Sequence, residues 1–538
     1  MFNEIPDSAK KLARTEATAS TKATKSNQTA APLRKETTQA HANQIFPKNI
    51  RFTPFQLAIL GILTFVFCAI CVGNGLIYST IRFDSPPEET IALLPATPLE
   101  SKPQLEETPL ATQASNELVV NTPTPTLELT RLPPAPVPSP TATYVVAPAL
   151  INKDKIAEII KFVEKQRQLS LPTEIPIKFL TRRQLREQWR DSSFDVATLE
   201  AVQTQQEFYR ILGLIEPDVD LVEAAFDSQT NILLGYYTPK EKAMYIIAES
   251  VNMFAEEEMT FAHEYVHALQ DYHFDLNNII TEDRSGDALL AARSLPEGDA
   301  RLVEELFTRE NIGQDELDYN IYRYLFQERP PLKGVSPALG IFTYFPYTAG
   351  EYFVIYLFIQ GNYSWDLVNQ AYYNLPVSSE QVMHPEKYLA GEVPIPIILP
   401  DLALALGSSW REIDRDVWGE AGFLVWLIDE VDDQTAINGA AGWDGDAYTL
   451  WVDQTDRRLL AESSLWASNA EATEFSEAFK VYMNLRGREV NSAAGDGVTM
   501  WEYEGGVTLL SRVERRVLLI IAPDRATLDS VRSQFAGF

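Results

Sequence analysis

The sequence predicts an α+β fold for residues 150–538, in which a small sheet accompanies several helices. Two observations lead to this expectation. Two strand-like runs, residues 232–237 and 243–248, flank a turn and precede a helical stretch from Met259 to Gln270. Beyond residue 400 the chain again mixes strand-like and helix-like segments, which indicates a smaller α+β subdomain.

Residues 52–82 are expected to form one transmembrane helix. The apolar run from Phe55 to Tyr78 lies between Arg51 and Arg82 and contains no charged residue. It is long enough to cross a bilayer, whereas the apolar core of a cleavable signal peptide is shorter. The alternative, a helix buried in a protein core, fits this length less well.

The flanking segments predict an orientation for this helix. Residues 1–51 carry an excess of Lys and Arg, while the residues that follow Arg82 are acidic. By the positive-inside rule, the N-terminal tail stays in the cytoplasm and the rest of the chain is exported. The composition of the tail predicts disorder, and the Pro/Thr-rich residues 83–149 predict an extended stalk.

The charge and the cysteines exclude several classes of function. The formal net charge is −30, and it arises from residues 149–538, because the basic tail with Arg82 balances the acidic stalk. Such a body repels nucleic acid. The two cysteines, Cys68 and Cys71, fall inside the apolar run. Any metal site in the body must therefore use His and carboxylate ligands rather than thiolates.

The residues before the strand-like runs predict helices around one further strand. Helical periodicity extends from Asp154 to Leu169, and another helix is expected from Thr198 to Leu212. Between them, residues 175–180 are expected to form a strand, followed by a helix that Thr181 could cap.

Residues 401–538 are expected to form an α+β subdomain packed on the preceding part. The expected elements are a helical region at 410–428, strands from Gly442 onward, a helix at 471–485, a buried strand at 517–521 and a final helix at 524–535. Asp444 and Asp446 could bind calcium, but the twelve-residue calcium-loop pattern is missing, so a turn is favoured.

The central helical stretch contains the pattern His-Glu-x-x-His, formed by His263, Glu264 and His267. Residues i and i+4 project from one face of a helix, so both histidines can bind one metal ion. Glu264 lies beside them, where its carboxylate could take a proton from a water molecule. The alternative is an amphipathic helix with histidines at its edge, but a chain with five histidines rarely acquires this pattern by chance.

A catalytic zinc site usually has three protein ligands, so one is missing from this pair. His273 is turned away from the face that carries His267, and it is expected to be a helix-end or surface histidine. The best candidate is Glu297, because Pro296 suits the first turn of a second helix, which would then start at this carboxylate. Glu304 and Glu305, farther along the same helix, are its rivals.

The motif His263–His267, followed on a second helix by Glu297-Gly298-x-Ala300, resembles the gluzincin group of zinc metallopeptidases. The resemblance covers about residues 150–400 and implies a zincin-like fold that binds Zn²⁺. It also implies that His263, His267 and Glu297 are the ligands and that Glu264 is the general base. Two features depart from the group: the spacing to Glu297 is longer than in the membrane aminopeptidases, and Arg301 occupies the position of an acid in thermolysin-like enzymes.

A hydrolase of this kind needs a donor to the oxyanion of its tetrahedral intermediate. His384 is the first candidate and Tyr347 the second, because thermolysin-like enzymes use a downstream His and the aminopeptidases a Tyr. The segments that begin at Phe345 and Pro376 also resemble those of membrane-anchored bacterial members of the group. A capping or buried hydrogen-bonded residue is the alternative for each donor.

Together these patterns predict a single-pass membrane protein with an extracytoplasmic zinc metallopeptidase domain at residues 150–400 and a peptide or protein substrate. The edge strand of the hairpin could pair with an extended substrate, or it could bind nothing. The alternatives are a surface-anchored binding or scaffold protein that keeps the same fold, and a zinc hydrolase of a non-peptide amide or ester. His and carboxylate ligands suit zinc best, although cobalt or manganese could substitute for it.

Overall fold

The computed structural model describes residues 153–192, 196–247, 253–279, 284–313, 333–489 and 497–538. The expected cytoplasmic tail (1–51), transmembrane helix (52–82) and stalk (83–149) lie outside these residues. Within the described ranges, no helix combines the length and the apolar character needed to cross a membrane.

A three-stranded sheet precedes the central helix, as the sequence predicts. β1 (Ile177–Leu180) pairs in parallel with β3 (Ala243–Ile247), and β2 (Gly235–Thr238) pairs with β3 in the antiparallel direction. The strand order is β1-β3-β2, so β2 is an edge strand of this sheet. The predicted hairpin is confirmed, and its last strand is completely buried.

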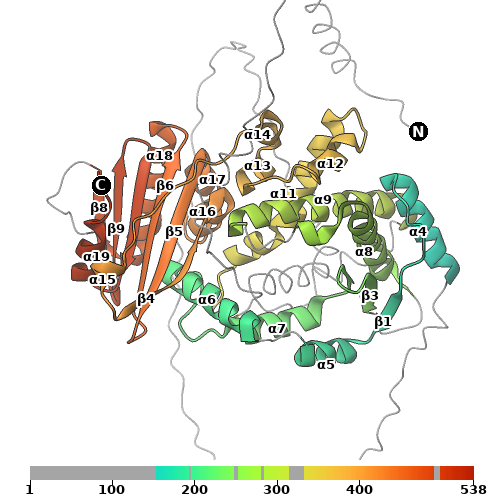
Figure 1. The fold of residues 1–538 in the computed structure, drawn as a ribbon, viewed down its shortest axis with the longest axis horizontal. Helices are drawn as coiled ribbons and strands as arrows, with labels where there is room; N and C mark the ends of the chain where they lie inside the picture. Colours follow the sequence, from blue (N-terminus) through green and yellow to red (C-terminus); the bar gives the residue numbers. More distant parts are fainter. Residues whose placement is uncertain (1–152, 193–195, 248–252, 280–283, 314–332, 490–496) are drawn as a thin grey trace, which may run out of the picture. The chain divides into compact units, whose positions relative to one another are not determined.

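Helix α8 (Ala255–Phe274) carries the central motif; α4 (Lys153–Arg167) and α9 (Gly286–Asn311) pack against it, and α11 (Ala338–Gln360) packs against α9 (Figure 1). They share one apolar core with Met244 of the sheet. α8 is buried along most of its length. Its polar side chains therefore need partners inside the protein, because an unpaired buried polar group costs free energy.

The start of α9 differs from the expectation. The helix begins at Gly286, where the side chain of Ser285 caps it by accepting a hydrogen bond from the backbone N–H of Ala288. Pro296 therefore lies inside the helix rather than in its first turn, and the prediction was wrong. A proline normally ends or kinks a helix because it lacks an N–H, but here buried packing on both sides of Pro296 holds the helix together.

The helix predicted after Thr181 is α5 (Arg182–Ser192), and the hydroxyl of Thr181 accepts a hydrogen bond from the backbone N–H of Gln184, as expected for its cap. The helix predicted from Thr198 to Leu212 is α6 (Val196–Leu212). The other helices of this part are α7 (Leu221–Ile232), η3 (Leu276–Asn278), α12 (Asp366–Ala371), α13 (Ser379–Met383) and α14 (Pro385–Ala390).

The C-terminal part is built on a seven-stranded antiparallel sheet in the order β4-β5-β6-β10-β9-β8-β7. Its strands are β4 (Trp410–Asp416), β5 (Trp443–Asp453), β6 (Arg458–Trp466), β7 (Arg488–Glu489), β8 (Val498–Tyr503), β9 (Gly506–Val513) and β10 (Arg516–Ala522). The helices are α15 (Ala403–Leu406), α16 (Gly419–Ile428), α17 (Asp433–Ala440), α18 (Asn469–Arg486) and α19 (Arg525–Arg532). α16, α17 and α18 pack on one face of the sheet and α19 on the other.

One C-terminal prediction was partly wrong. The expected helical region at 410–428 is a strand, β4, followed by the helix α16. Pairing with β5 decides this, because a short stretch of mixed polarity has no strong preference of its own. The expected helix at 471–485, the strand at 517–521 and the final helix are confirmed as α18, β10 and α19.

Asp444 and Asp446 lie in strand β5 rather than in a turn, so the expected turn was wrong. The carboxylate of Asp446 accepts hydrogen bonds from the backbone N–H groups of Trp418 and Gly419 and from the indole of Trp443. The two backbone donors, Trp418 and Gly419, tie β5 to the start of α16.

The apolar core between the large sheet and helices α16, α17 and α18 crosses the predicted boundary at residue 400. It contains Phe208 and Leu212 of α6, and also Ala338 and Leu339 at the start of α11. The two parts therefore share buried apolar surface, and the division into 150–400 and 401–538 stays a prediction.

Candidate metal centre

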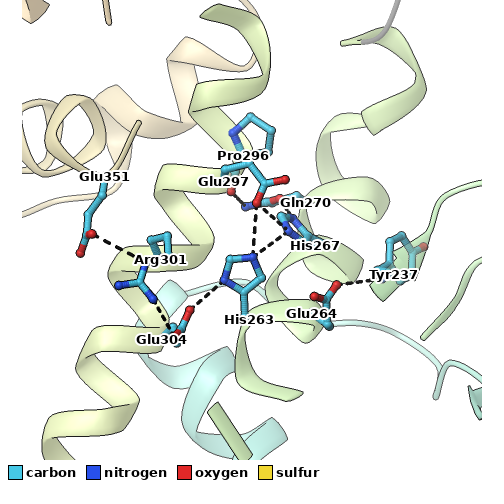
Figure 2. Close-up of polar contacts among 10 residues, drawn as sticks. All are labelled: Tyr237, His263, Glu264, His267, Gln270, Pro296, Glu297, Arg301, Glu304 and Glu351. Carbon is cyan, nitrogen blue, oxygen red and sulfur yellow. Dashed lines mark hydrogen bonds and ion pairs between the residues drawn. The ribbon is translucent and has the colours of Figure 1, made fainter. Parts of the chain in front are cut away.

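Three side chains from two helices converge on one point (Figure 2). His263 and His267 come from α8, and Glu297 comes from α9. The two histidine Nε2 atoms lie 3.1 Å apart, and Oε2 of Glu297 lies 3.3 Å from the Nε2 of His263 and 3.4 Å from that of His267. Ligands placed about 2.0–2.1 Å from a tetrahedral zinc ion would be separated by about 3.3 Å. The three atoms therefore fit the donor set of a zinc ion.

The outer nitrogen of each histidine is held by an oxygen. Nδ1 of His263 lies 3.0 Å from Oε2 of Glu304, and Nδ1 of His267 lies 2.8 Å from the side-chain oxygen of Gln270. A carboxylate or amide oxygen only accepts, so each Nδ1 carries a proton and donates. Both Nε2 atoms then direct a lone pair at the same point, which is how metal-binding histidines are usually oriented.

Three convergent acceptors repel one another unless a positive charge lies between them. Burial lowers the pKa of His263, but its hydrogen bonds to Glu297 and Glu304 outweigh this and raise it to about 10. Burial also raises the pKa of Glu297, yet the neighbouring His267 and His263 bring it down to about 2. These opposite pKa shifts favour a proton between the histidines and Glu297, at the position that a metal cation could also occupy.

The structure separates Glu297 from its rivals. Glu304 faces the outer nitrogen of His263 and also accepts a 2.6 Å hydrogen bond from Nη1 of Arg301. Burial raises the pKa of Glu304, but Arg301 and His263 outweigh it and hold the pKa below its ordinary value. Glu305 instead forms an ion pair with Arg309. Glu297 is the one of the three carboxylates that joins the proposed ligand set.

Glu264 lies beside the two histidines, on the side of α8 that faces the three-stranded sheet. Its Oε2 accepts a 2.8 Å hydrogen bond from the backbone N–H of Tyr237 in the edge strand β2. Its Oε1 is buried and has no hydrogen-bond partner among the described residues. The charge of Glu264 contributes to the raised pKa of both His263 and His267, so it lies close to them. The edge strand therefore binds the carboxylate at Tyr237, a contact that the sequence did not predict.

Of the two expected oxyanion donors, Tyr347 lies near the centre. Its ring centroid is 6.1 Å from that of His263, with an angle of 28° between the planes. A buried cation, Arg293, is also close: burial lowers its pKa to about 9, while Glu297 and Tyr347 act in the opposite direction. Tyr347 is thus part of the surroundings of the ligands.

His384 has other neighbours. Its Nε2 lies 2.9 Å from Oε1 of Glu420 at the start of α16, and its Nδ1 lies 4.0 Å from Glu386. None of its contacts in the described part of the chain involves a residue of the metal centre. His273 lies at the end of α8, as expected, and its Nε2 donates to the backbone oxygen of Ser170.

Sequence reasoning missed the supporting residues Gln270, Arg301 and Glu304 in their actual roles. Helical spacing could have indicated two of them, because Gln270 is one turn after His267, and Glu304 is two turns after Glu297. The amide of Gln270 also donates to the backbone oxygen of Pro296, which links α8 to α9 next to the ligand.

Comparisons with known proteins concern the C-terminal part. The family model described as a domain of unknown function (DUF8575) matches residues 407–532. No curated protein matches the chain, and no solved structure does. The matched residues contain the seven-stranded sheet with α16, α17, α18 and α19, and none of the residues of the candidate metal centre.

Proposed function

We propose that this protein is a zinc-dependent peptidase, anchored in a membrane by residues 52–82 with its catalytic domain outside the cytoplasm. The observation that carries the proposal is the convergence of His263, His267 and Glu297 with Glu264 beside them. Three protein ligands leave a fourth position for water or substrate, which is typical of catalytic rather than structural zinc sites.

The protein residues would divide the work of hydrolysis. A bound zinc ion would polarise the substrate carbonyl and lower the pKa of a water molecule to about 7. Glu264 would receive the proton of that water on Oε1, while the amide of Tyr237 holds Oε2 in place. The same carboxylic acid would then deliver the proton to the leaving nitrogen.

Tyr347 is the favoured donor to the developing oxyanion. Its ring lies beside His263, whereas the contacts of His384 are with Glu420 and Glu386. A donor acts only when it lies within hydrogen-bond distance of the oxygen that gains charge. The proximity of Tyr347 to a ligand therefore supports it over His384, although His384 was the first candidate from the sequence.

Two other functions use the same ligands. A binding or scaffold protein would hold zinc without turnover, and a zinc hydrolase of another amide or ester would cleave a different bond. The position of Glu264 beside the two histidines supports an enzyme, because a protein that only binds the metal has no need of a general base. Peptide cleavage in particular rests on the resemblance to gluzincins.

The test compares the full-length protein with two variants, Glu264→Gln and the control Glu310→Gln. Glu310 is exposed near the end of α9, so its variant changes the same charge away from the centre. We expect about one zinc per chain in all three proteins, and cleavage of casein or a peptide mixture in all but Glu264→Gln. Zinc without cleavage in the wild type would favour the binding protein, and no zinc would refute the metal site.

The membrane anchor has its own test. Deletion of residues 52–82 should release the protein from the membrane fraction of expressing cells, whereas the intact chain should resist extraction with alkaline carbonate. In intact cells or spheroplasts, external protease should reach the body but not the N-terminal tail. A soluble intact chain would refute the anchor and leave the zinc site untouched.

A further inference from the structure

We propose that Arg301 is a positioning residue for the metal centre, which acts on His263 through Glu304. The inference rests on the metal site of the proposed function, and it assigns a role to a residue that departs from the thermolysin-like pattern. It explains why a cation is tolerated where those enzymes carry an acid.

A series of polar contacts runs from Glu351 of α11 through Arg301 and Glu304 to His263, a proposed metal ligand (Figure 2). Nη1 of Arg301 donates to Oε1 of Glu304 over 2.6 Å, and Oε2 of the same carboxylate lies 3.0 Å from Nδ1 of His263. On its other side, Nε of Arg301 lies 3.7 Å from Oε2 of Glu351 in α11. The guanidinium therefore lies between two carboxylates from two helices.

Glu304 needs such a partner because it is buried. Its exposed fraction is 1%, and that of Arg301 is 8%. A buried carboxylate with a single neutral hydrogen-bond donor would be costly, and its side chain could rotate away from His263. The ion pair with Arg301 occupies Oε1 and leaves Oε2 directed at His263.

The orientation of His263 follows from this arrangement. An imidazole bound at Nδ1 by a fixed carboxylate keeps its proton there and presents the lone pair of Nε2 to the metal. Glu297, Arg301 and Glu304 are spaced at i, i+4 and i+7 on α9, so the proposed ligand, the cation and the supporting carboxylate share one helix face. α9 thus contributes both a ligand and the support for a ligand on α8.

The experiment measures the zinc affinity of the full-length protein by competition with a chromophoric chelator, using the metal alone as the probe. Removal of the direct partner in Glu304→Gln should weaken zinc binding by about 10–100-fold. Arg301→Gln should weaken it by about tenfold. The double variant should bind zinc no more weakly than Glu304→Gln, because an effect transmitted through Glu304 is lost with it.

A matched control is available on the same helix. Arg309→Gln removes an arginine that pairs with Glu305 at the exposed end of α9, and it should leave zinc affinity unchanged. The visible spectrum of the Co²⁺-substituted proteins provides a second readout, because it reports the geometry around the metal. We expect it to change in Arg301→Gln and to stay as in the wild type in Arg309→Gln.

Three results would overturn the proposal. They are wild-type zinc affinity in Arg301→Gln, losses that add in the double variant, and an equal loss in Arg309→Gln. If Arg301→Gln does not fold, Arg301→Lys carries the test, because an ammonium group lacks the fork that reaches Glu304 and Glu351 together. The zinc affinity of Arg301→Lys should fall by less than the expected tenfold loss in Arg301→Gln. If Arg301→Lys binds zinc as tightly as the wild type does, the proposal is overturned. Absence of zinc from the wild type would refute the proposed function as well.

Discussion

Gly298 of α9 lies directly against Gly350 of α11, backbone to backbone. A Cβ atom added at Gly298 would lie 2.0 Å from the carbonyl oxygen of Gly350, and one added at Gly350 would lie 2.2 Å from that of Ser294. Gly298 is the residue after Glu297, the proposed third ligand. This close packing fixes the position of α9, the helix that carries Glu297.

The first prediction concerns this contact. Gly298→Ala should destabilise the protein by about 1–3 kcal/mol or more, because a clash with backbone cannot be relieved by a rotamer change. It should also weaken zinc binding by displacing Glu297. The control is Gly340→Ala near the start of α11, where no atom lies within 4 Å of the added Cβ. Thermal unfolding should show little change or a small gain there, and equal losses in the two variants would contradict this interpretation.

The second prediction is that zinc uptake releases a proton. In the metal-free protein, the pKa of His263 is raised to about 10, and the ligand must be neutral to bind zinc. Below that pH the proton competes with the metal, so apparent affinity should rise with pH by up to about tenfold per unit. Calorimetry in buffers with different ionisation enthalpies measures the released proton.

A suitable comparison for this experiment is His273→Ala, which removes a histidine outside the centre. It should release the same number of protons on zinc binding as the wild type. Zinc affinity that is independent of pH between 6 and 9 would show that His263 is already neutral before the metal binds.

The third prediction concerns a buried ion pair behind the ligand. Asp299 of α9 accepts hydrogen bonds from Nε of Arg167 over 2.7 Å and from the hydroxyl of Tyr372 over 2.8 Å, and both charged side chains are completely buried. Asp299→Asn should cost about 3–5 kcal/mol of stability, because it leaves Arg167 as an uncompensated buried charge.

Chemical denaturation would measure this loss. The control is Asp529→Asn in α19, which removes one partner of the exposed pair with Arg525. Exposed ion pairs contribute little, so this change should cost under about 1 kcal/mol. A similar cost for both variants would mean that the buried pair does not anchor α4 to α9.

The fourth prediction is a loss of stability as the pH rises. Burial raises the pKa of Asp287, at the start of α9, from 3.8 to about 7, and the charges of Asp446 and Glu420 add to this effect. The folded protein therefore binds the proton more tightly than the unfolded chain does. The stability that results is fully present below about pH 4 and is lost as the pH rises to about 7.

The Asp287→Asn variant should show a flatter dependence over this range. At about 1.4 kcal/mol per pKa unit, the difference amounts to about 4 kcal/mol at most. Urea denaturation at pH 5 and pH 8 would measure it. Parallel curves for variant and wild type would indicate that Asp287 is ionised throughout this range in the folded protein.

Much of the local structure could be predicted from the sequence. The hairpin, the His263–His267 helix and the helices α4, α6 and α18 follow from periodicities of two or 3.6 residues, which reflect nearest neighbours along the chain. The prediction failed where distant residues decide. At β4, pairing with β5 outweighs a helical interpretation, and at Pro296 buried packing keeps α9 continuous.

The sequence by itself determined that His263 and His267 share one helix face and that Glu264 lies next to them, because the helical repeat places residues i and i+4 together. It favoured Glu297 as the third ligand but left Glu304 and Glu305 open as rivals, since a second helix can present any of them. The tertiary structure decided this through the packing of α8 against α9 and of α9 against α11 at Gly298 and Gly350. That packing directs Glu297 to both Nε2 atoms and leaves Glu304, with Arg301 behind it, at the outer nitrogen of His263.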